Sequence, residues 1–171
     1  NGLEVGVWID GFGHGATLFG ADGENPKTYT QIEGVDGKVS EHAFCPEDEE
    51  FTKDYCDAIK LLASLNPDLI MLDDDFRINV RSYYYTMGCF CEKHLKIYYE
   101  LLGEEVPRDK IKELAFTGEK NKYRDAYYDM LAHTLLKFAK TIRSALDEVN
   151  PSIRMGACIT CEAIDACGTD F

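Results

Sequence analysis

The chain has 171 residues, a formal net charge of −13 and 45% hydrophobic residues. This composition suits one globular domain, but a complete eight-stranded α/β barrel typically needs about 250 residues. Binding to nucleic acid depends on clustered Lys and Arg, so the acidic charge argues against it, while a neutral carbohydrate partner stays compatible. The sequence holds no apolar run of the roughly 20 residues that a membrane span needs. We therefore predict that residues 1–171 form a single, incomplete domain with no second domain.

The first half of the chain begins with a predicted buried strand over Leu3–Ile9, closed by a glycine-rich loop. Residues 16–44 are Gly-rich and polar with weak periodicity, and we expect an ordered functional loop there. Pro46 then begins a helix, whose acidic first turn complements the helix dipole. The predicted inward stripe of this helix comprises Phe51, Tyr55, Ile59, Leu62 and Leu65.

The second half continues the alternation of strands and helices. Residues 68–72 are a continuous apolar run, which predicts a strand buried on both faces. We expect helices over Leu95–Leu102, from Pro107 onward and over about Tyr123–Val149, and a third strand over Ile153–Ile159. The apolar residues at helical spacing in the long helix are Tyr127, Met130, Leu131, Leu135, Phe138, Ile142 and Leu146. This order of elements is typical of a parallel α/β sheet.

Polar residues gather where the predicted strands end. Asp10 follows the first strand, Arg77 lies beyond the second, and Glu162 lies just past the third, while Trp8 adds an aromatic ring near the first strand end. Sites of parallel α/β folds are built at the carboxyl ends of the strands. We therefore expect these four residues to contact substrate, although Arg77 could instead pair with a neighbouring aspartate.

The run Asp73-Asp74-Asp75 directly ends the second strand. Closely placed carboxylates repel each other and raise the pKa of one of them, which keeps a general acid protonated near neutral pH. The alternative is a solvated acidic turn, which is what most charge runs are.

Three cysteines and a histidine have the spacing of a metal site. The turn Cys89-x-Cys91 is followed three residues later by His94, and Cys45 supplies a distant fourth ligand. The alternative is a set of buried thiols beside a surface histidine. The chain has seven cysteines, an odd number, and the Cys-x-Cys spacing suits chelation better than a disulfide framework. A reducing cytoplasm is therefore the expected compartment.

These motifs resemble the α/β-barrel glycoside hydrolases of clan A, and most nearly the family 42 β-galactosidases. In that family a Cys-Pro pair opens the helix after the third strand, Asp-Asn-Glu-Tyr ends the fourth strand, and a zinc-binding Cys-x-Cys-x2-Cys follows. The counterparts in this chain are Cys45-Pro46, Asp73-Asp74-Asp75-Phe76 and Cys89-x-Cys91-x2-His94. Residues 34–38 and 150–152 are also similar to that family.

The resemblance implies a fragment of a (β/α)8 TIM barrel with parallel strands, spanning roughly the third to fifth β/α units. It places Asp75 at the family's acid/base glutamate and Asp74 at the asparagine that contacts the sugar 2-hydroxyl. Both positions depart from the family's pattern: Asp75 is one methylene shorter, and Asp74 replaces a hydrogen-bond donor by a negative charge. The resemblance also implies a structural zinc and a nucleophile on a later strand, outside residues 1–171.

The sequence thus favours a carbohydrate-active, glycoside hydrolase-like enzyme of the β-galactosidase kind, with Asp75 as the catalytic acid/base. A non-hydrolytic carbohydrate-binding barrel relative is one alternative. A hydrolase in which the aspartates hold a catalytic metal is another. Assembly of the full-length protein into a homo-oligomer is compatible with each of them.

Overall fold

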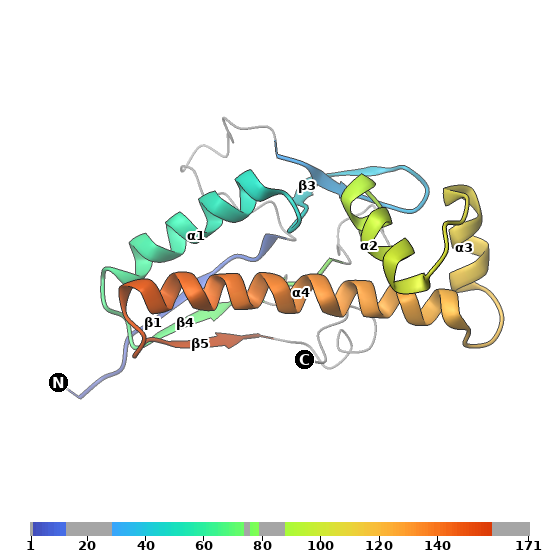
Figure 1. Cartoon of the computed structure of the whole chain (residues 1–171). Coiled ribbons are helices and arrows are strands. Elements are labelled where there is room, and N and C mark those ends of the chain that lie inside the picture. The colour runs from blue at the N-terminus through green and yellow to red at the C-terminus, as the bar shows by residue number, and fades with distance from the viewer. Residues whose placement is uncertain (1, 13–28, 74–75, 79–87, 159–171) are drawn as a thin grey trace.

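The computed structural model describes residues 2–12, 29–73, 76–78 and 88–158. Within them, β1 (Gly6–Ile9), β4 (Leu69–Leu72) and β5 (Arg154–Ala157) form a parallel sheet in the order β1-β4-β5 (Figure 1). The register sets Val7 opposite Ile70, and Ile70 opposite Met155. The predicted parallel α/β sheet is therefore confirmed, although β1 is shorter than the apolar run that predicted it.

In the described part of the chain, four helices accompany the sheet: α1 (Glu49–Ala63), α2 (Glu92–Leu102), α3 (Arg108–Phe116) and α4 (Lys122–Val149). Figure 1 shows α4 running the length of the molecule, beside α1 at one end and beside α2 and α3 at the other. All seven apolar positions predicted for the long helix are buried. Among the described residues, none of the helices combines the length and the apolar character that a membrane crossing requires.

The inward stripe predicted for α1 is correct except at its end. Phe51, Tyr55 and Ile59 are fully buried and Leu62 is half-buried, but Leu65 is 73% exposed. The helix ends at Ala63, and Asn66 follows with a positive φ of 55°. Leu65 has therefore left the helical spacing that would have turned it inward.

The predicted long loop over residues 16–44 contains two strands that the sequence did not reveal. β2 (Gln31–Glu33) and β3 (Val39–Phe44) pair antiparallel. The turn between them closes through hydrogen bonds between Gly34 and both Lys38 and Gly37, and Gly37 has a φ of 80°. Because β2 is only three residues long, it gives too little alternation to stand out in the sequence.

The prediction that β4 is buried on both faces is wrong for the described residues. Ile70 and Leu72 are buried on the face that packs against the helices, whereas Leu69 and Met71 are only half-buried on the other face. On that second face Trp8 of β1 is 60% exposed. We call the face that carries Trp8, Leu69 and Met71 the open face of the sheet.

Candidate metal centre and strand-end site

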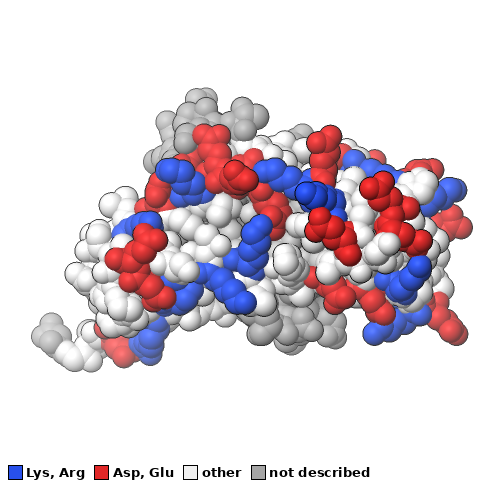
Figure 2. Space-filling model, in the orientation of Figure 1, with Lys and Arg blue, Asp and Glu red and all other residues white. Residues whose placement is uncertain are grey.

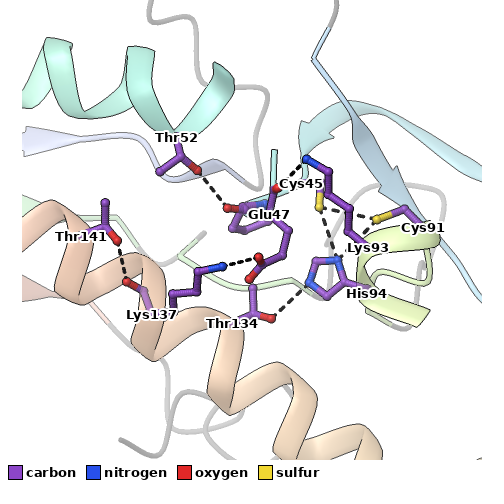
Figure 3. Close-up of polar contacts among 10 residues, drawn as sticks. Cys45, Glu47, Thr52, Cys91, Lys93, His94, Thr134, Lys137 and Thr141 are labelled. Carbon is purple, nitrogen blue, oxygen red and sulfur yellow. Dashed lines mark hydrogen bonds and ion pairs between the residues drawn. The ribbon is translucent and has the colours of Figure 1, made fainter. Parts of the chain in front are cut away.

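The four predicted metal ligands come together in the interior. The ligand atoms of Cys45, Cys89, Cys91 and His94 all lie within 4.8 Å of one another, and all four residues are buried. Cys45 Sγ lies 3.7 Å from Cys91 Sγ, and His94 Nδ1 lies 3.3 Å from Cys45 Sγ and 3.5 Å from Cys91 Sγ. Figure 3 shows these side chains of Cys45, Cys91 and His94 pointing toward one another.

These distances can accommodate a tetrahedral metal ion. With Zn–S bonds of about 2.3 Å and Zn–N bonds of about 2.0–2.1 Å, ligand atoms around zinc are about 3.8 Å apart for two sulfurs and about 3.6 Å apart for sulfur and nitrogen. The observed separations of 3.7 Å and of 3.3 to 3.5 Å are close to these values. Three sulfurs and one imidazole nitrogen are also a donor set that zinc prefers.

Separate elements position the ligands of this Cys3His cluster. Cys45 directly follows β3, and its N–H donates to Thr30 O at 2.8 Å. Cys91 is the N-cap residue of α2, so His94 falls in the first turn of the same helix. A thiol at a helix N-terminus ionises more readily, because the helix dipole favours negative charge there.

The cysteine turn fits closely against α4. Gly88 has a φ of 79°, and a Cβ atom built on it would lie 3.1 Å from Tyr127 Cε2 and 3.2 Å from Leu131 Cδ2. The ring of Phe90 stacks on Tyr127 with an interplanar angle of 5°, and the Phe90 N–H donates to Glu33 O. The turn is thereby fixed to both α4 and β2.

Charge is unevenly shared within the cluster. Hydrogen bonds with Cys89 and Cys91 raise the pKa of Cys45, whereas hydrogen bonds from Cys45 and Cys89 lower the pKa of Cys91. Burial alone would lower the pKa of His94, but hydrogen bonds and charge from Cys89 and Cys91 outweigh it and raise that pKa to about 10. Metal binding would need thiolates and a neutral imidazole, so the ion would displace these protons.

One contact of the cluster was not predicted from the sequence. His94 Nε2 lies 3.2 Å from Thr134 Oγ1, and both residues are 0% exposed. Figure 3 shows Thr134 of α4 on the side of the imidazole ring away from the sulfurs. Thr134 lies 40 residues from His94 in the sequence, so only the packing of α4 on α2 reveals the pair.

At the carboxyl end of the sheet, Trp8 Nε1 donates a hydrogen bond of 2.6 Å to Asp73 Oδ1. Asp73 is half-buried, and its N–H donates to Ile9 O at 3.0 Å. Asp10, two residues after Trp8, is exposed. Its backbone carbonyl accepts a hydrogen bond from Tyr55 OH at 3.1 Å. Trp8 and Asp10 were predicted for this edge, but the hydrogen bond from Trp8 to Asp73 was not.

Of the other predicted strand-end residues, Arg77 lies within the described part of the chain. Arg77 is buried, with 3% of its surface exposed. Asp74, Asp75 and Glu162 lie outside the described residues. The catalytic and sugar-contact roles predicted for these four positions therefore stay predictions.

A groove of about 410 Å³ lies elsewhere, between α1 and α4, and has Phe138 and Cys56 among its lining residues. Three ion pairs lie among its charged residues: Lys53 with Asp57, Lys60 with Glu148, and Lys137 with Glu47. Figure 2 shows acidic and basic side chains interspersed on the face of the molecule that it displays. The groove therefore offers a surface of mixed charge, and neither the Cys3His cluster nor the Trp8–Asp73 pair is among its lining residues.

No protein-family model matches the chain, and no curated protein sequence matches it. Among solved structures, the chain resembles the catalytic domain of β-amylase from Paenibacillus polymyxa, with a TM-score of 0.51 and 16% sequence identity. The match covers 76% of this chain and 42% of the β-amylase chain. The chain thus spans less than half of that structure. At this identity the likeness shows the fold alone, that of part of the β-amylase catalytic domain, and the resemblance to barrel glycoside hydrolases and to family 42 stays a prediction.

Proposed function

We propose that the chain forms part of the (β/α)8 barrel of a glycoside hydrolase-like protein and binds a carbohydrate at the carboxyl end of its sheet. The observation that supports this is the Trp8–Asp73 pair. Trp8 is 60% exposed, and its indole N–H donates to the Asp73 carboxylate at 2.6 Å. A fixed, exposed aromatic face can stack on the apolar face of a sugar ring, and the neighbouring carboxylate can accept hydrogen bonds from sugar hydroxyls.

The position of the pair agrees with where barrel enzymes bind their substrates. Trp8 lies in β1, and Asp73 directly follows β4 at the carboxyl edge of the parallel sheet. Active sites of TIM barrels lie at this edge because the loops after the strands converge there. Asp10, which follows β1, would contribute a further polar contact to the sugar.

In this proposal Asp75 donates the proton to the leaving group, and Asp74 orients the sugar. Arg77 and Glu162 are further proposed contacts. A retaining glycosidase needs a second carboxylate about 5 Å from the first to act as the nucleophile. The resemblance assigns that nucleophile to a strand outside residues 1–171. Residues 1–171 would thus supply the general acid/base, and another part of the barrel would supply the nucleophile.

We further propose that Cys45, Cys89, Cys91 and His94 hold a structural zinc ion. The donor set and the separations of 3.3 to 3.7 Å support zinc. Four protein ligands fill a tetrahedral site and leave no position for a reactive water. The ion would join β3, the cysteine turn and α2, and so keep the segment after β4 in place.

The test of carbohydrate binding uses Trp8, the one tryptophan among residues 1–171. Titration of the full-length protein with galactosides and glucosides should change the tryptophan emission with saturation. The Trp8→Phe variant should lose the part of this change that comes from Trp8 and bind the sugar more weakly by calorimetry. The matched control is Tyr128→Phe, which alters an exposed aromatic residue of α4 instead of one in the sheet. Equal saccharide affinity in wild type and Trp8→Phe would contradict the proposed site.

Hydrolysis is tested separately with a panel of nitrophenyl glycosides on the full-length protein and its Asp75→Asn variant, with zinc measured on the same samples. Turnover that disappears in the variant while zinc is retained supports the proposed proton donor. The Asp-Asp sequence, in place of the family's Asn-Glu, favours one alternative, a carbohydrate-binding relative without hydrolysis. Saturable sugar binding without turnover in either protein would favour that relative. Turnover lost to mild chelation and restored by a divalent ion would favour a metal-dependent hydrolase.

A further inference from the structure

We propose that Thr134 of α4 is a positioning residue, which holds His94 so that its Nδ1 atom faces the metal and thereby couples α4 to the metal centre. This inference rests on the proposed metal site. It adds a residue that lies outside the four ligands and that no sequence motif marks. The carrying observation is the 3.2 Å contact between His94 Nε2 and Thr134 Oγ1.

The two nitrogen atoms of the His94 imidazole face different partners. Nδ1 lies within 3.5 Å of two sulfur atoms, whereas Nε2 faces the hydroxyl of Thr134. When a metal occupies one nitrogen of a neutral imidazole, the other nitrogen carries the proton. Nε2–H would then donate to Thr134 Oγ1, and this hydrogen bond fixes both the tautomer and the orientation of the ring.

The hydroxyl of Thr134 differs from another threonine hydroxyl on the same helix. Thr141 Oγ1 donates to Lys137 O, four residues earlier in α4, at 2.9 Å. Thr134 is fully buried, and its hydroxyl instead contacts His94 of α2. Figure 3 shows both threonines on α4, with only Thr134 directed at the imidazole. Thr141 therefore provides a matched control on the same element.

A neutral acceptor also suits the charge of this site. Three thiolates around one divalent zinc leave a net negative charge, so a carboxylate partner for the histidine would add repulsion in a buried place. A hydroxyl accepts the imidazole proton without adding charge. The neutral Thr134 can therefore orient His94 at little electrostatic cost.

The decisive comparison is zinc affinity in wild type, Thr134→Val, Thr134→Ser and Thr141→Val, measured by competition with a chromogenic chelator. Valine keeps the shape of threonine but leaves the Nε2 proton without an acceptor in the interior. We expect Thr134→Val to weaken zinc binding by about 10- to 100-fold, the usual effect of removing such a partner. Thr134→Ser should restore most of the affinity, and Thr141→Val should leave it unchanged.

A merely structural role for Thr134 predicts a different pattern. Its loss would lower the stability of the metal-free and metal-loaded protein equally, and zinc affinity would stay the same in all four proteins. That result would overturn the inference while leaving the metal site intact. Absence of zinc binding in the wild type would instead remove the proposed metal site itself, and the inference with it.

A second measurement does not depend on a variant that folds. In the zinc-loaded wild type, the nitrogen chemical shifts of the His94 ring report which nitrogen binds the metal and which carries the proton. We expect metal on Nδ1 and a proton on Nε2. Metal on Nε2 would overturn the inference, because Nε2 could not then donate to Thr134.

Discussion

The Cys3His cluster and the strand-end site contrast in how far their polar groups are enclosed. In the cluster, the four candidate ligands are buried close together, and the buried Thr134 contacts one of them, His94. At the strand ends, Trp8 is fixed by Asp73 but keeps 60% of its surface exposed. Enclosed groups of this kind stabilise a fold, whereas a fixed but exposed group remains available to a ligand. Substitutions should therefore change stability at the cluster and ligand binding at the strand ends.

The largest expected effect comes from Cys45→Ser, which removes one of the four ligands. We expect the variant to lose zinc and with it the stabilisation that bound metal provides, about 4 kcal/mol when free zinc is a thousand times its Kd. Chemical denaturation with and without zinc measures this. Cys56→Ser is the matched control, since Cys56 is a buried thiol of α1 outside the cluster. Equal zinc content and equal stability in Cys45→Ser and wild type would contradict the metal centre.

A smaller effect is expected for Gly88→Ala, which tests the fit of the cysteine turn against α4. The positive φ of 79° and the close approach of Tyr127 and Leu131 should together cost about 2–4 kcal/mol of unfolding free energy. Gly103→Ala is the control, because Gly103 has the same φ of 79° but no neighbour within 4 Å of a built Cβ. If both variants lose equal stability, crowding against α4 contributes nothing.

Asp48→Ala should cost about 2 kcal/mol, at the upper end of the range for a helix N-cap. Asp48 Oδ1 accepts the N–H of Phe51 at 2.9 Å, and Oδ2 accepts both the N–H and the hydroxyl of Thr30. The side chain therefore joins the start of α1 to the segment before β2. Thermal unfolding measures the stability of Asp48→Ala, and Asp57→Asn is the control for the loss of a negative charge on α1. The exposed Asp57–Lys53 ion pair should contribute less than about 0.5 kcal/mol to stability.

The smallest stability effect is expected at the strand ends. Asp73→Ala removes the acceptor of the Trp8 indole and should lower stability by no more than about 1.5 kcal/mol. Saccharide affinity should nevertheless fall, because the aromatic ring is no longer held in place. A large loss of stability with unchanged saccharide affinity would reverse the contrast between the two regions.

Much of the fold could be predicted because it depends on local patterns. The seven apolar positions of α4 follow helical spacing over a long segment, and each is buried. The ligand set was also visible, because Cys89, Cys91 and His94 lie within one short turn and Cys45 lies shortly before α1, although that helix begins at Glu49 and not at Pro46 as predicted. Local spacing was enough in both cases.

The parts that the sequence did not reveal depend on contacts between distant segments or on short elements. Thr134 meets His94 only because α4 packs beside α2, and nothing in the spacing of either residue marks that contact. The apolar run of β4 predicted burial on both faces, yet Leu69 and Met71 lie on the open face. A continuous apolar run shows that a strand is hydrophobic. It does not show which faces of the strand are buried, because that depends on the elements packed around it.

The most direct test of the account is the zinc content of the purified protein, determined by elemental analysis together with the number of reactive thiols. We expect one zinc per chain, and a chelator under denaturing conditions should release the zinc and expose the three ligand thiols to reagent together with the buried thiol of Cys56. The Cys45→Ser variant should contain none. Fully folded protein that contains no zinc and takes up none when it is supplied would contradict the central claim.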